Sequence, residues 1–253
     1  MVLLLDIKLV DLDYKHFKNE VFLTEVIMNY LVVVAHPDDE VLGAGATISK
    51  LTAQGHNVDL CVMCKEAKAR SYRPQDDELE QDFKTVADML KIRTCYGGNF
   101  PNIEMNNTSH IQLVQFIENA IIKTEPDVII THHPNDTNND HLHTSLACQA
   151  AIRIFQRRSD VKPLKEFWYM EIQSSTEWSV NTAMNFFSPN LFVEIGYEGV
   201  QVKVNALSKY RGVMRPYPHP RSEEAIRGLA AYRGSQFGCN FAEAFECVLR
   251  RIV

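Results

Sequence analysis

The sequence predicts an α/β protein with a Rossmann-like, doubly wound and mostly parallel sheet that has helices on both faces. Short apolar runs rich in valine, isoleucine and leucine alternate along the chain with longer segments of helical apolar spacing. Strands that are apolar throughout, rather than at every second residue, are typical of a parallel sheet that is covered on both faces. Strand–helix alternation of this kind builds such a sheet through crossovers of nearly fixed hand.

The first half of the chain contains four predicted strands. The first covers residues 31–35, and helical spacing follows over residues 39–54, where Gly55 ends the helix. The other strands of this half are predicted at 58–63, 94–96 and 128–131, and the remaining helices at 78–90, 109–123 and 140–155. Each strand is therefore followed by a helical segment long enough to cross over the sheet.

After residue 160 the alternation is less regular. Strands are predicted at 167–172 and 191–195, and helices at 200–210 and 223–233. Residues 216–220 contain three prolines, too many for either element, and predict an ordered loop. Residues 1–30 have no clear period. We expect them to be an N-terminal extension of a single domain that covers residues 31–253.

Bulk composition limits the classes of function. With 253 residues, of which 45% are apolar, the chain buries a large core without disulfides. A formal net charge of −6 argues against binding to nucleic-acid phosphates. Asp6 and Lys8 interrupt the apolar start, no signal-cleavage site follows it, and no run approaches the roughly 18 apolar residues of a membrane span. We therefore expect a cytoplasmic protein with no nucleic-acid partner and no stable membrane insertion.

Three polar clusters follow predicted strands, at residues 36–40, 99–102 and 132–141. In an open parallel sheet, ligands bind outside the carboxyl ends of the strands, so these clusters are expected to lie together. His36 and Asp39 straddle a strand-to-helix turn, and His141 begins another predicted helix. Two imidazoles and one carboxylate, with an open position for water, are typical of a hydrolytic zinc site.

Asp38 lies next to these candidate ligands and is free to act as a general base. A bound zinc ion would bring the pKa of its water towards neutrality and so assist that base. The alternative is structural, because a histidine after a strand often packs or caps, and acidic residues at a helix start often complement the helix dipole. The second histidine cluster, at an equivalent strand end, favours the functional interpretation. We interpret Glu40 as a structural neighbour of the helix start.

Two motifs together resemble those of a known family. The run Ala-His-Pro-Asp-Asp-Glu at 35–40, followed by Gly43 and Gly45, and the run ending in Asp-His at 132–141 resemble the PIG-L/LmbE family of zinc-dependent N-deacetylases. The resemblance extends over about residues 30–250. It implies a Rossmann-like fold and hydrolysis of the N-acetyl group of an amino sugar.

The resemblance also implies roles for individual residues: zinc, or another divalent ion such as Fe²⁺, held by His36, Asp39 and His141, with Asp38 as the base. Many members have a histidine three positions before the last ligand, where it helps to stabilise the oxyanion. This chain has Asn138 there, whose amide can donate a hydrogen bond but carries no positive charge. The acid that protonates the leaving amine is either Asp38 or a group such as His219, for which packing in the loop is an equal alternative.

Substrate-binding candidates are harder to separate from ordinary surface residues. Arg73 and Arg221 are candidates for a phosphate or nucleotide of an activated sugar, because a guanidinium binds such groups bidentately. Asn99 and Asn102 follow the third predicted strand and are candidates for sugar hydroxyls, although turn formation explains them equally well.

The sequence therefore predicts a zinc-dependent de-N-acetylase that acts on an N-acetylated sugar, nucleotide sugar or lipid-linked sugar. Segments 215–222, 232–235 and 242–245 resemble a subgroup that we associate with bacterial surface-polysaccharide or natural-product pathways. A homo-oligomer is compatible with the sequence. Two alternatives stay open: a metal-dependent amidase or esterase on a non-sugar substrate, and a non-catalytic sugar- or nucleotide-binding module.

Overall fold

Seven strands form one sheet in the spatial order β3-β2-β1-β4-β5-β7-β6. The computed structural model describes residues 26–66, 74–180 and 186–252. The strands are β1 (Asn29–Val34), β2 (Asn57–Val62), β3 (Thr94–Gly97), β4 (Val128–His132), β5 (Glu166–Met170), β6 (Leu191–Glu194) and β7 (Ala242–Arg250). Strands β1 to β5 pair in parallel, and β7 pairs antiparallel with both β5 and β6. The predicted, mostly parallel sheet is confirmed.

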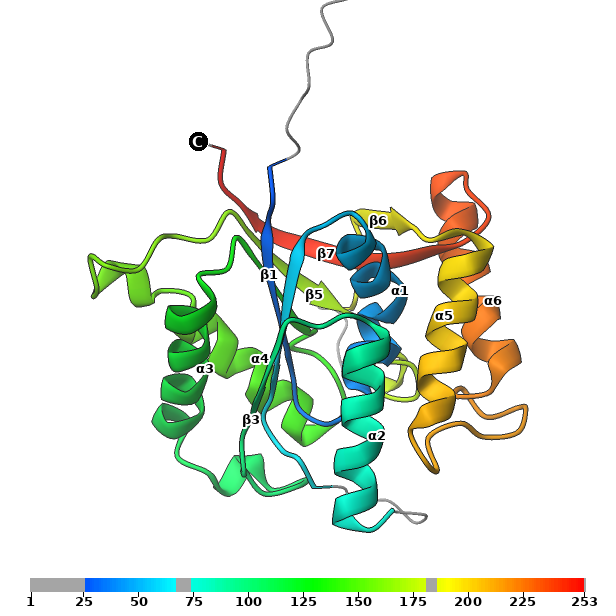
Figure 1. The fold of residues 1–253 in the computed structure, drawn as a ribbon, viewed down its shortest axis with the longest axis horizontal. Coiled ribbons are helices and arrows are strands. Elements are labelled where there is room, and N and C mark those ends of the chain that lie inside the picture. The colour runs from blue at the N-terminus through cyan, green and yellow to red at the C-terminus, as the bar shows by residue number, and fades with distance from the viewer. Residues whose placement is uncertain (1–25, 67–73, 181–185, 253) are drawn as a thin grey trace, which may run out of the picture.

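Six α-helices, counted over the described ranges, cover both faces of this sheet (Figure 1). They are α1 (Asp39–Ala53), α2 (Asp76–Met89), α3 (His110–Thr124), α4 (Asn139–Ala151), α5 (Gly196–Lys209) and α6 (Glu223–Phe237). Helices α1, α2, α5 and α6 pack on one face in one apolar cluster, and α3 and α4 pack on the other face in a second cluster. The doubly wound arrangement is therefore the observed one.

Strand β1 shows why the sequence pattern predicted a sheet covered on both sides. Val32 and Val34 belong to the cluster under α1, whereas Leu31 and Val33 belong to the cluster under α3 and α4. All four side chains are fully buried. Successive side chains of a strand point to opposite faces, so a strand without polar positions needs cover on both.

The two loops that carry the predicted site leave neighbouring strands. Strands β2 and β3 extend the sheet on one side of β1, and β4 and β5 extend it on the other side. The order of the strands therefore reverses between β1 and β4. In doubly wound sheets this reversal opens a crevice at the carboxyl ends of the strands, where ligands bind. Residues 36–40 follow β1 and residues 133–138 follow β4, so both segments border the crevice.

Helix α6 ends at Phe237, four residues after its predicted end at residue 233, and three other elements also differ from the predictions. Helix α5 begins at Gly196, four residues before its predicted start at residue 200, and Gly199 lies where α5 meets α1. A Cβ on Gly199 would lie 2.8 Å from the Cβ of Ile195 and 3.5 Å from the Cβ of Ala46. Helix α4 ends at Ala151 instead of residue 155, and a separate 3₁₀ turn follows. Strand β7 was not predicted, because only its first four residues are buried and it lacks a continuous apolar run.

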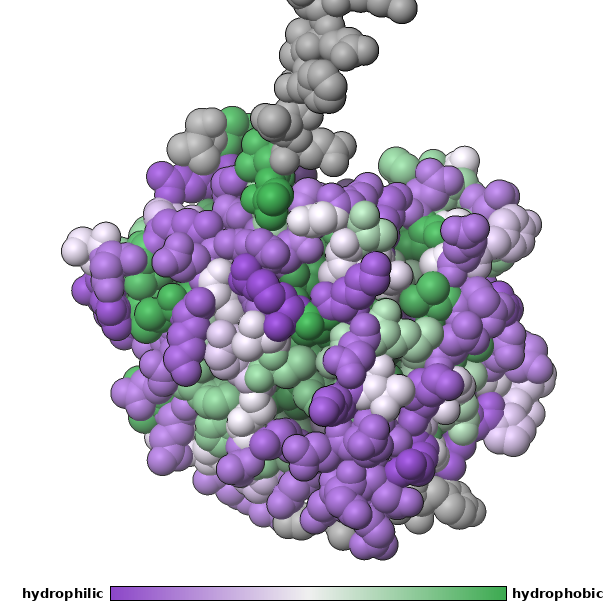
Figure 2. All heavy atoms as spheres, viewed as in Figure 1, coloured by the Kyte–Doolittle hydropathy of each residue, from purple (hydrophilic) through white to green (hydrophobic). Residues whose placement is uncertain are grey.

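The ends and the surface of the domain complete the description. Of the predicted N-terminal extension, residues 1–25 lie outside the described residues, and the proposed division into an extension and one domain stays a prediction. Hydrophilic side chains cover most of the face seen in Figure 2. Among the described helices, none combines the length and apolar character needed to cross a membrane.

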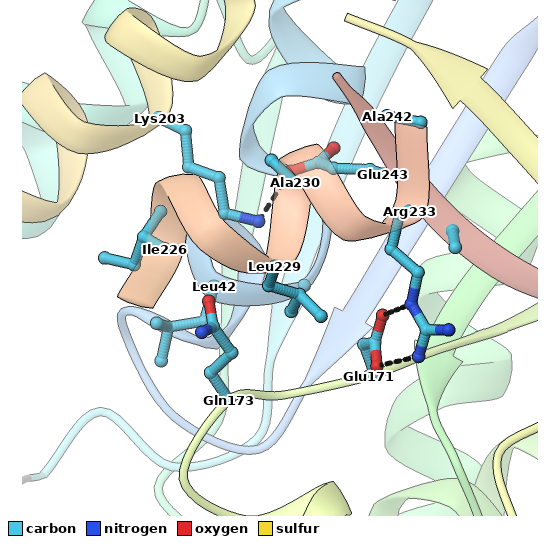
Figure 3. A pocket seen from close by; sticks show the side chains of 12 residues that line it. Leu42, Glu171, Gln173, Lys203, Ile226, Leu229, Ala230, Arg233, Ala242 and Glu243 are labelled. Atoms are coloured by element: carbon cyan, nitrogen blue, oxygen red, sulfur yellow. Dashed lines mark hydrogen bonds and ion pairs between the residues drawn. The ribbon is translucent and has the colours of Figure 1, made fainter. Parts of the chain in front are cut away.

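A buried ion pair connects β7 to two helices of one layer. The Nζ of Lys203 in α5 lies 2.7 Å from the Oε1 of Glu243 in β7, and each residue is at most 5% exposed (Figure 3). The carboxylate of Glu243 also accepts the backbone N–H groups of Ala46 and Thr47 in α1, at 3.2 and 2.7 Å. These contacts attach the strand that the sequence did not predict to the helix that begins at the site.

We expect the substitution Lys203→Met to lower the free energy of unfolding by about 3 kcal/mol, because it leaves the carboxylate of Glu243 buried without its cation. Urea denaturation followed by circular dichroism measures this change. The matched control is the double variant Lys203→Met/Glu243→Gln, which removes both charges and should recover part of the loss. A single variant as stable as the wild type would contradict the prediction.

Candidate active site

The first motif forms the tight connection between β1 and α1. His36 and Pro37 leave β1, and α1 begins at Asp39. The carboxylate of Asp39 turns back and accepts the backbone N–H of His36 at 2.9 Å. The carbonyl of Asp38 accepts the first N–H groups of the helix, from Val41 and Leu42. This folding of the motif onto itself brings the side chains of His36 and Asp39 to the same side of the turn.

The second motif forms the connection between β4 and α4. Asn138 is the N-cap of α4, and its Oδ1 accepts the backbone N–H groups of Asp140 and His141 at 2.9 and 3.4 Å. The carboxylate of Asp136 in turn accepts the N–H of Asn138 at 2.8 Å. Capping of this kind satisfies backbone donors that have no partner within the helix. It also fixes His141 in the first turn of α4, where its ring faces the first motif.

The three predicted metal ligands converge. The Oδ2 of Asp39 lies 3.3 Å from the Nδ1 of His36 and 3.3 Å from the Nε2 of His141. One donor atom from each residue can be chosen so that all lie within 4.8 Å of one another, and all three residues are buried. Two imidazole nitrogens and one carboxylate oxygen at this spacing suit a divalent cation such as zinc, with positions left for water or substrate. The donor set that the structure presents therefore fits a metal.

Each imidazole has a second carboxylate on its other nitrogen. The Nε2 of His36 lies 2.8 Å from Asp140, whose oxygens also accept the N–H groups of Ile103 and Met105. The Nδ1 of His141 lies 3.2 Å from Asp136. Carboxylates in this position select the tautomer of a metal-binding histidine and hold the orientation of its ring. This pairing leaves the Nδ1 of His36 and the Nε2 of His141 to face Asp39.

Among His36, Asp39 and His141, protons on the imidazoles balance the negative charge of the carboxylate. Burial opposes the protonation of His141, but the charge of Asp39 and the hydrogen bond with Asp136 outweigh it and raise the pKa to about 10. Burial also opposes the ionisation of Asp39, but His141 outweighs it and holds the pKa of Asp39 well below its usual range. Burial lowers the pKa of His36, yet the hydrogen bond with Asp140 raises it overall. A divalent cation would supply the positive charge that these protons supply here.

His132 ends β4 and lies at the site, and His133 follows it. The ring of His132 stacks on that of His141, with centroids 4.0 Å apart, and its Nε2 accepts the N–H of Ala35 at 2.8 Å. Burial, followed by the positive charge of His141, lowers the pKa of His132 to about 3, so the ring is neutral. His133 contacts Glu246, Tyr169 and other groups away from the metal ligands. We infer that His132 supports the ligand loop rather than the cation.

Asp38 lies beside the ligands with 2% of its surface exposed. It lines a cavity of about 120 Å³ whose wall comprises His36, Asp38, Asp39, Glu66, Asn102, Ile103, Asn138, His141 and Arg221. The Nη1 of Arg221 lies 3.1 Å from the Oδ2 of Asp38, and its Nε donates to the hydroxyl of Ser174 at 2.8 Å. The predicted base and one predicted substrate-binding arginine therefore share a single small cavity with the metal ligands.

The other predicted site residues do not all lie with Asp38 and Arg221 in this cavity. Asn102, rather than Asn99, lines the cavity; Asn99 is exposed and forms an isolated bridge with Cys64. His219 is exposed and does not line it, and its Nδ1 accepts the N–H of Arg221. Arg73 lies outside the described residues. The predicted roles of Asn99, His219 and Arg73 stay predictions.

Glu40 has more contacts than its interpretation as a neighbour of the helix start implies. It is fully buried, and its carboxylate accepts the hydroxyl of Tyr210 at 2.6 Å and the backbone N–H of Asp38 at 3.0 Å. Burial raises the pKa of Glu40 to about 8, although the hydrogen bond from Tyr210 opposes the rise. A carboxylate in this environment is not a solvated helix-dipole partner.

Sequence reasoning missed Asp136 and Asp140. Asp136 lies in a loop rich in asparagine and aspartate, where turn formation is the ordinary explanation. Asp140 lies in the first turn of α4, where an acidic residue ordinarily complements the helix dipole. A signal was available, because a metal-binding histidine almost always donates its second ring N–H to an acceptor. The hydroxyls of Ser175 and Thr176, which both donate to Asp136, come from a segment 39 and 40 residues further along the chain. No pattern in the local sequence predicts these two contacts.

We expect Asp136→Asn to weaken divalent-metal binding by about 10- to 100-fold, because the amide cannot hold His141 by its charge. Isothermal titration of the metal-free protein with Zn²⁺ measures the change. Asp160→Asn is the control, since Asp160 is an aspartate that pairs with Arg158 on the surface. Equal Zn²⁺ affinity for Asp136→Asn and the wild type would refute a role for Asp136 in orienting the ligand.

The fold and the site together define a class: a doubly wound α/β protein with a buried two-histidine, one-carboxylate centre for a divalent metal at its topological switch point. Residues 31–152 match the family described as PIG-L: GlcNAc-PI de-N-acetylase. That range contains His36, Asp39 and His141 together with Asp38. The family predicted from the two motifs is therefore the one that residues 31–152 match.

Individual relatives cover most of the chain at low identity. The diacetylchitobiose deacetylase of Thermococcus kodakarensis is 24% identical over 234 residues, which are 88% of this chain and 84% of the relative. The N,N′-diacetylchitobiose deacetylase structure from Pyrococcus horikoshii has a TM-score of 0.72 and 18% identity, over 88% of this chain and 84% of that one. The 4-carboxy-2-hydroxymuconate hydratase of Pseudomonas putida also has a TM-score of 0.72, with 17% identity over 90% and 98%. These structures confirm the fold, and the hydratase shows that the fold carries more than one reaction.

Proposed function

We propose that this protein is a divalent-metal-dependent N-deacetylase that hydrolyses the acetamide of an N-acetylated amino sugar or its conjugate. The observation that carries the proposal is the shared cavity, where a carboxylate outside the metal-ligand set, Asp38, lies beside His36, Asp39 and His141. The match of residues 31–152 to the PIG-L family and the similarity to a diacetylchitobiose deacetylase support an amide of an amino sugar as the substrate.

Zinc is the proposed ion, held by His36, Asp39 and His141. A bound zinc ion acidifies water and polarises a carbonyl. The protein contributes the orientation of the donors, since Asp140 and Asp136 hold the outer nitrogens of the two imidazoles. The protein also shields the ion from bulk water, because all three donor residues are buried.

Asp38 is the proposed base. It would accept a proton from the attacking water, whose oxygen then bonds to the acetamide carbonyl carbon. Arg221, whose Nη1 lies 3.1 Å from the Oδ2 of Asp38, pairs with this carboxylate in the shared cavity. The C–N bond breaks when the sugar nitrogen receives a proton, and the products are acetate and a free amine. We propose that Asp38 returns this proton, because His219 does not line the cavity.

Asn138 is the proposed donor to the oxygen that becomes negative during the attack. Its side-chain oxygen is already used by the backbone N–H groups at the start of α4. The amide nitrogen is therefore the part of the side chain that can donate. It would serve in place of the histidine that the family resemblance leads us to expect at this position.

The finer features of the substrate are also proposals. Arg221 and Arg73 would contact a phosphate on a nucleotide-linked or lipid-linked sugar, and Asn102 would contact a hydroxyl. We also propose that the protein acts in the cytoplasm, where nucleotide sugars are its candidate substrates. Assembly into a homo-oligomer stays part of the proposal.

A free-amine assay of the zinc-loaded protein tests the function. The panel contains N-acetylglucosamine, its 1-phosphate, UDP-N-acetylglucosamine, N,N′-diacetylchitobiose and non-sugar acetamides. The proposal is supported if the wild-type protein releases amine and acetate in equal amounts from a sugar and the Asp38→Asn variant releases neither. Activity on the non-sugar amides alone would replace it with an amidase, and a protein that binds zinc but releases no amine across the panel would refute it.

A further inference from the structure

The backbone of Asp38 has an unusual conformation. Among the described non-glycine residues with positive φ, Asp38 has the largest value, 107° with ψ −26°, whereas the others lie between 46° and 76°. The latter values are close to the left-handed region that asparagine and aspartate adopt with little cost. A φ of 107° lies outside that region. Conformations of this kind persist only where the surrounding structure holds them, and they concentrate at functional sites.

Hydrogen bonds hold both peptide groups of Asp38. Its carbonyl accepts the N–H groups of Val41 and Leu42, at 3.1 and 2.9 Å, so the start of α1 fixes one side. Its own N–H donates to the Oε2 of Glu40 at 3.0 Å, so a side chain two residues later fixes the other side. The direction of the Asp38 side chain therefore depends on where the Glu40 carboxylate is held.

Tyr210 holds that carboxylate from a distant part of the chain. It lies directly after α5, 170 residues from Glu40, and its hydroxyl donates to the Oε1 at 2.6 Å. Tyr210 is 1% exposed and Glu40 is fully buried. Helix α5 packs against α1, so the hydroxyl approaches from the body of the protein and not from a surface loop. Two buried hydrogen bonds, which meet at the Glu40 carboxylate, thus connect Tyr210 to the Asp38 backbone.

We propose that Tyr210 and Glu40 are positioning residues for the base: the tyrosine hydroxyl fixes the Glu40 carboxylate, which holds the Asp38 N–H and so directs the Asp38 side chain towards the cavity and Arg221. This inference rests on the proposed function in so far as Asp38 is the base. It adds a role for residues that touch neither the cation nor the substrate.

Tyr210→Phe removes one hydroxyl and keeps the ring. It should lower kcat about tenfold and leave KM and the bound zinc content unchanged, because a small misplacement of a catalytic group acts on the reaction step. In an Asp38→Asn background the same change should have no further effect, since the misplaced group is already inactive. Equal losses of kcat in both backgrounds would show a general structural role and overturn the proposal.

Substitutions of Glu40 provide a second test. Glutamine can accept the Asp38 N–H through its oxygen and donate to the Tyr210 oxygen through its nitrogen. Glu40→Gln should therefore retain kcat within about threefold, whereas Glu40→Ala should lose about 100-fold. If Glu40→Ala matches the glutamine variant, the proposal fails. Thr124→Val is the control, because it removes a different buried hydroxyl hydrogen bond, 2.8 Å to Ala120, at the end of α3.

A crystal structure of Tyr210→Phe separates this proposal from the proposed function, because it needs no substrate. We expect the φ of Asp38 to leave its value near 107° and the contact between Asp38 and Arg221 to lengthen or break. Unchanged geometry at Asp38 would overturn the positioning role even if the enzyme hydrolyses sugars. Changed geometry in a protein that binds zinc but hydrolyses no member of the panel would support the positioning role and refute the function.

Discussion

Replacement of Asp38 by asparagine is expected to lower kcat by about 10³-fold while zinc still binds. An asparagine has nearly the shape of the aspartate but cannot accept a proton at neutral pH, so the change removes the proposed base and leaves the three proposed ligands in place. Two measurements together test this prediction: the metal content of the purified variant by mass spectrometry, and its kcat in the amine assay.

The matched control is Asp59→Asn. Asp59 is fully buried in β2 and accepts two hydrogen bonds from Arg93, so it resembles Asp38 in burial and in its arginine partner. It does not line the cavity. Its substitution should lower the free energy of unfolding and leave kcat unchanged. A metal-loaded Asp38→Asn enzyme with unaltered turnover would show that another group removes the proton.

Replacement of Asp39 by alanine is expected to abolish stable metal binding. The carboxylate lies 3.3 Å from a nitrogen of each proposed ligand histidine, so its loss removes a donor atom and one negative charge next to the cation. The loss of Zn²⁺ affinity should exceed the roughly 10- to 100-fold effect expected for an outer carboxylate. Isothermal titration with Zn²⁺ compares Asp39→Ala with Asp136→Asn and the wild type. A ranking in which Asp136→Asn binds Zn²⁺ more weakly than Asp39→Ala would contradict the assignment of Asp39.

The same titration has an expected pH dependence. Without a cation, the pKa of His141 is about 10, so its ring holds a proton at neutral pH. A cation must displace that proton to reach the Nε2, so the apparent Zn²⁺ affinity should fall as the pH is lowered below that value. A Zn²⁺ affinity independent of pH would indicate that His141 does not bind the cation. Titrations in buffers of different ionisation enthalpy measure the number of protons released.

Much of the site could be predicted from the sequence because its key residues follow strand ends. His36 and Asp39 come after β1, and His141 comes after β4. In a doubly wound sheet these two strands are neighbours and their carboxyl ends share one crevice. Once strand–helix alternation is recognised, topology alone brings the two motifs together, and the convergence of the three side chains agrees with that expectation.

Contacts across the sheet or between helices could not be predicted in the same way. Tyr210 lies 170 residues from Glu40, and Arg221 lies 183 residues from Asp38. Arg221 was a candidate for binding substrate phosphate, but its contact with Asp38, the proposed base, appears only in the folded chain. Strand β7, with only its first half buried, has too weak a pattern to be recognised from its own residues.

The sequence by itself determined the class of fold, the identity of the three metal-ligand candidates and the presence of a spare carboxylate beside them. These features depend on local periodicity and on chemistry concentrated in two short motifs. Only the tertiary structure decided which groups orient that chemistry: Asp136 and Asp140 on the imidazoles, Glu40 and Tyr210 on the Asp38 backbone, and Arg221 on its side chain. The reason is physical, because hydrogen bonds act over about 3 Å in space and do not depend on separation along the chain.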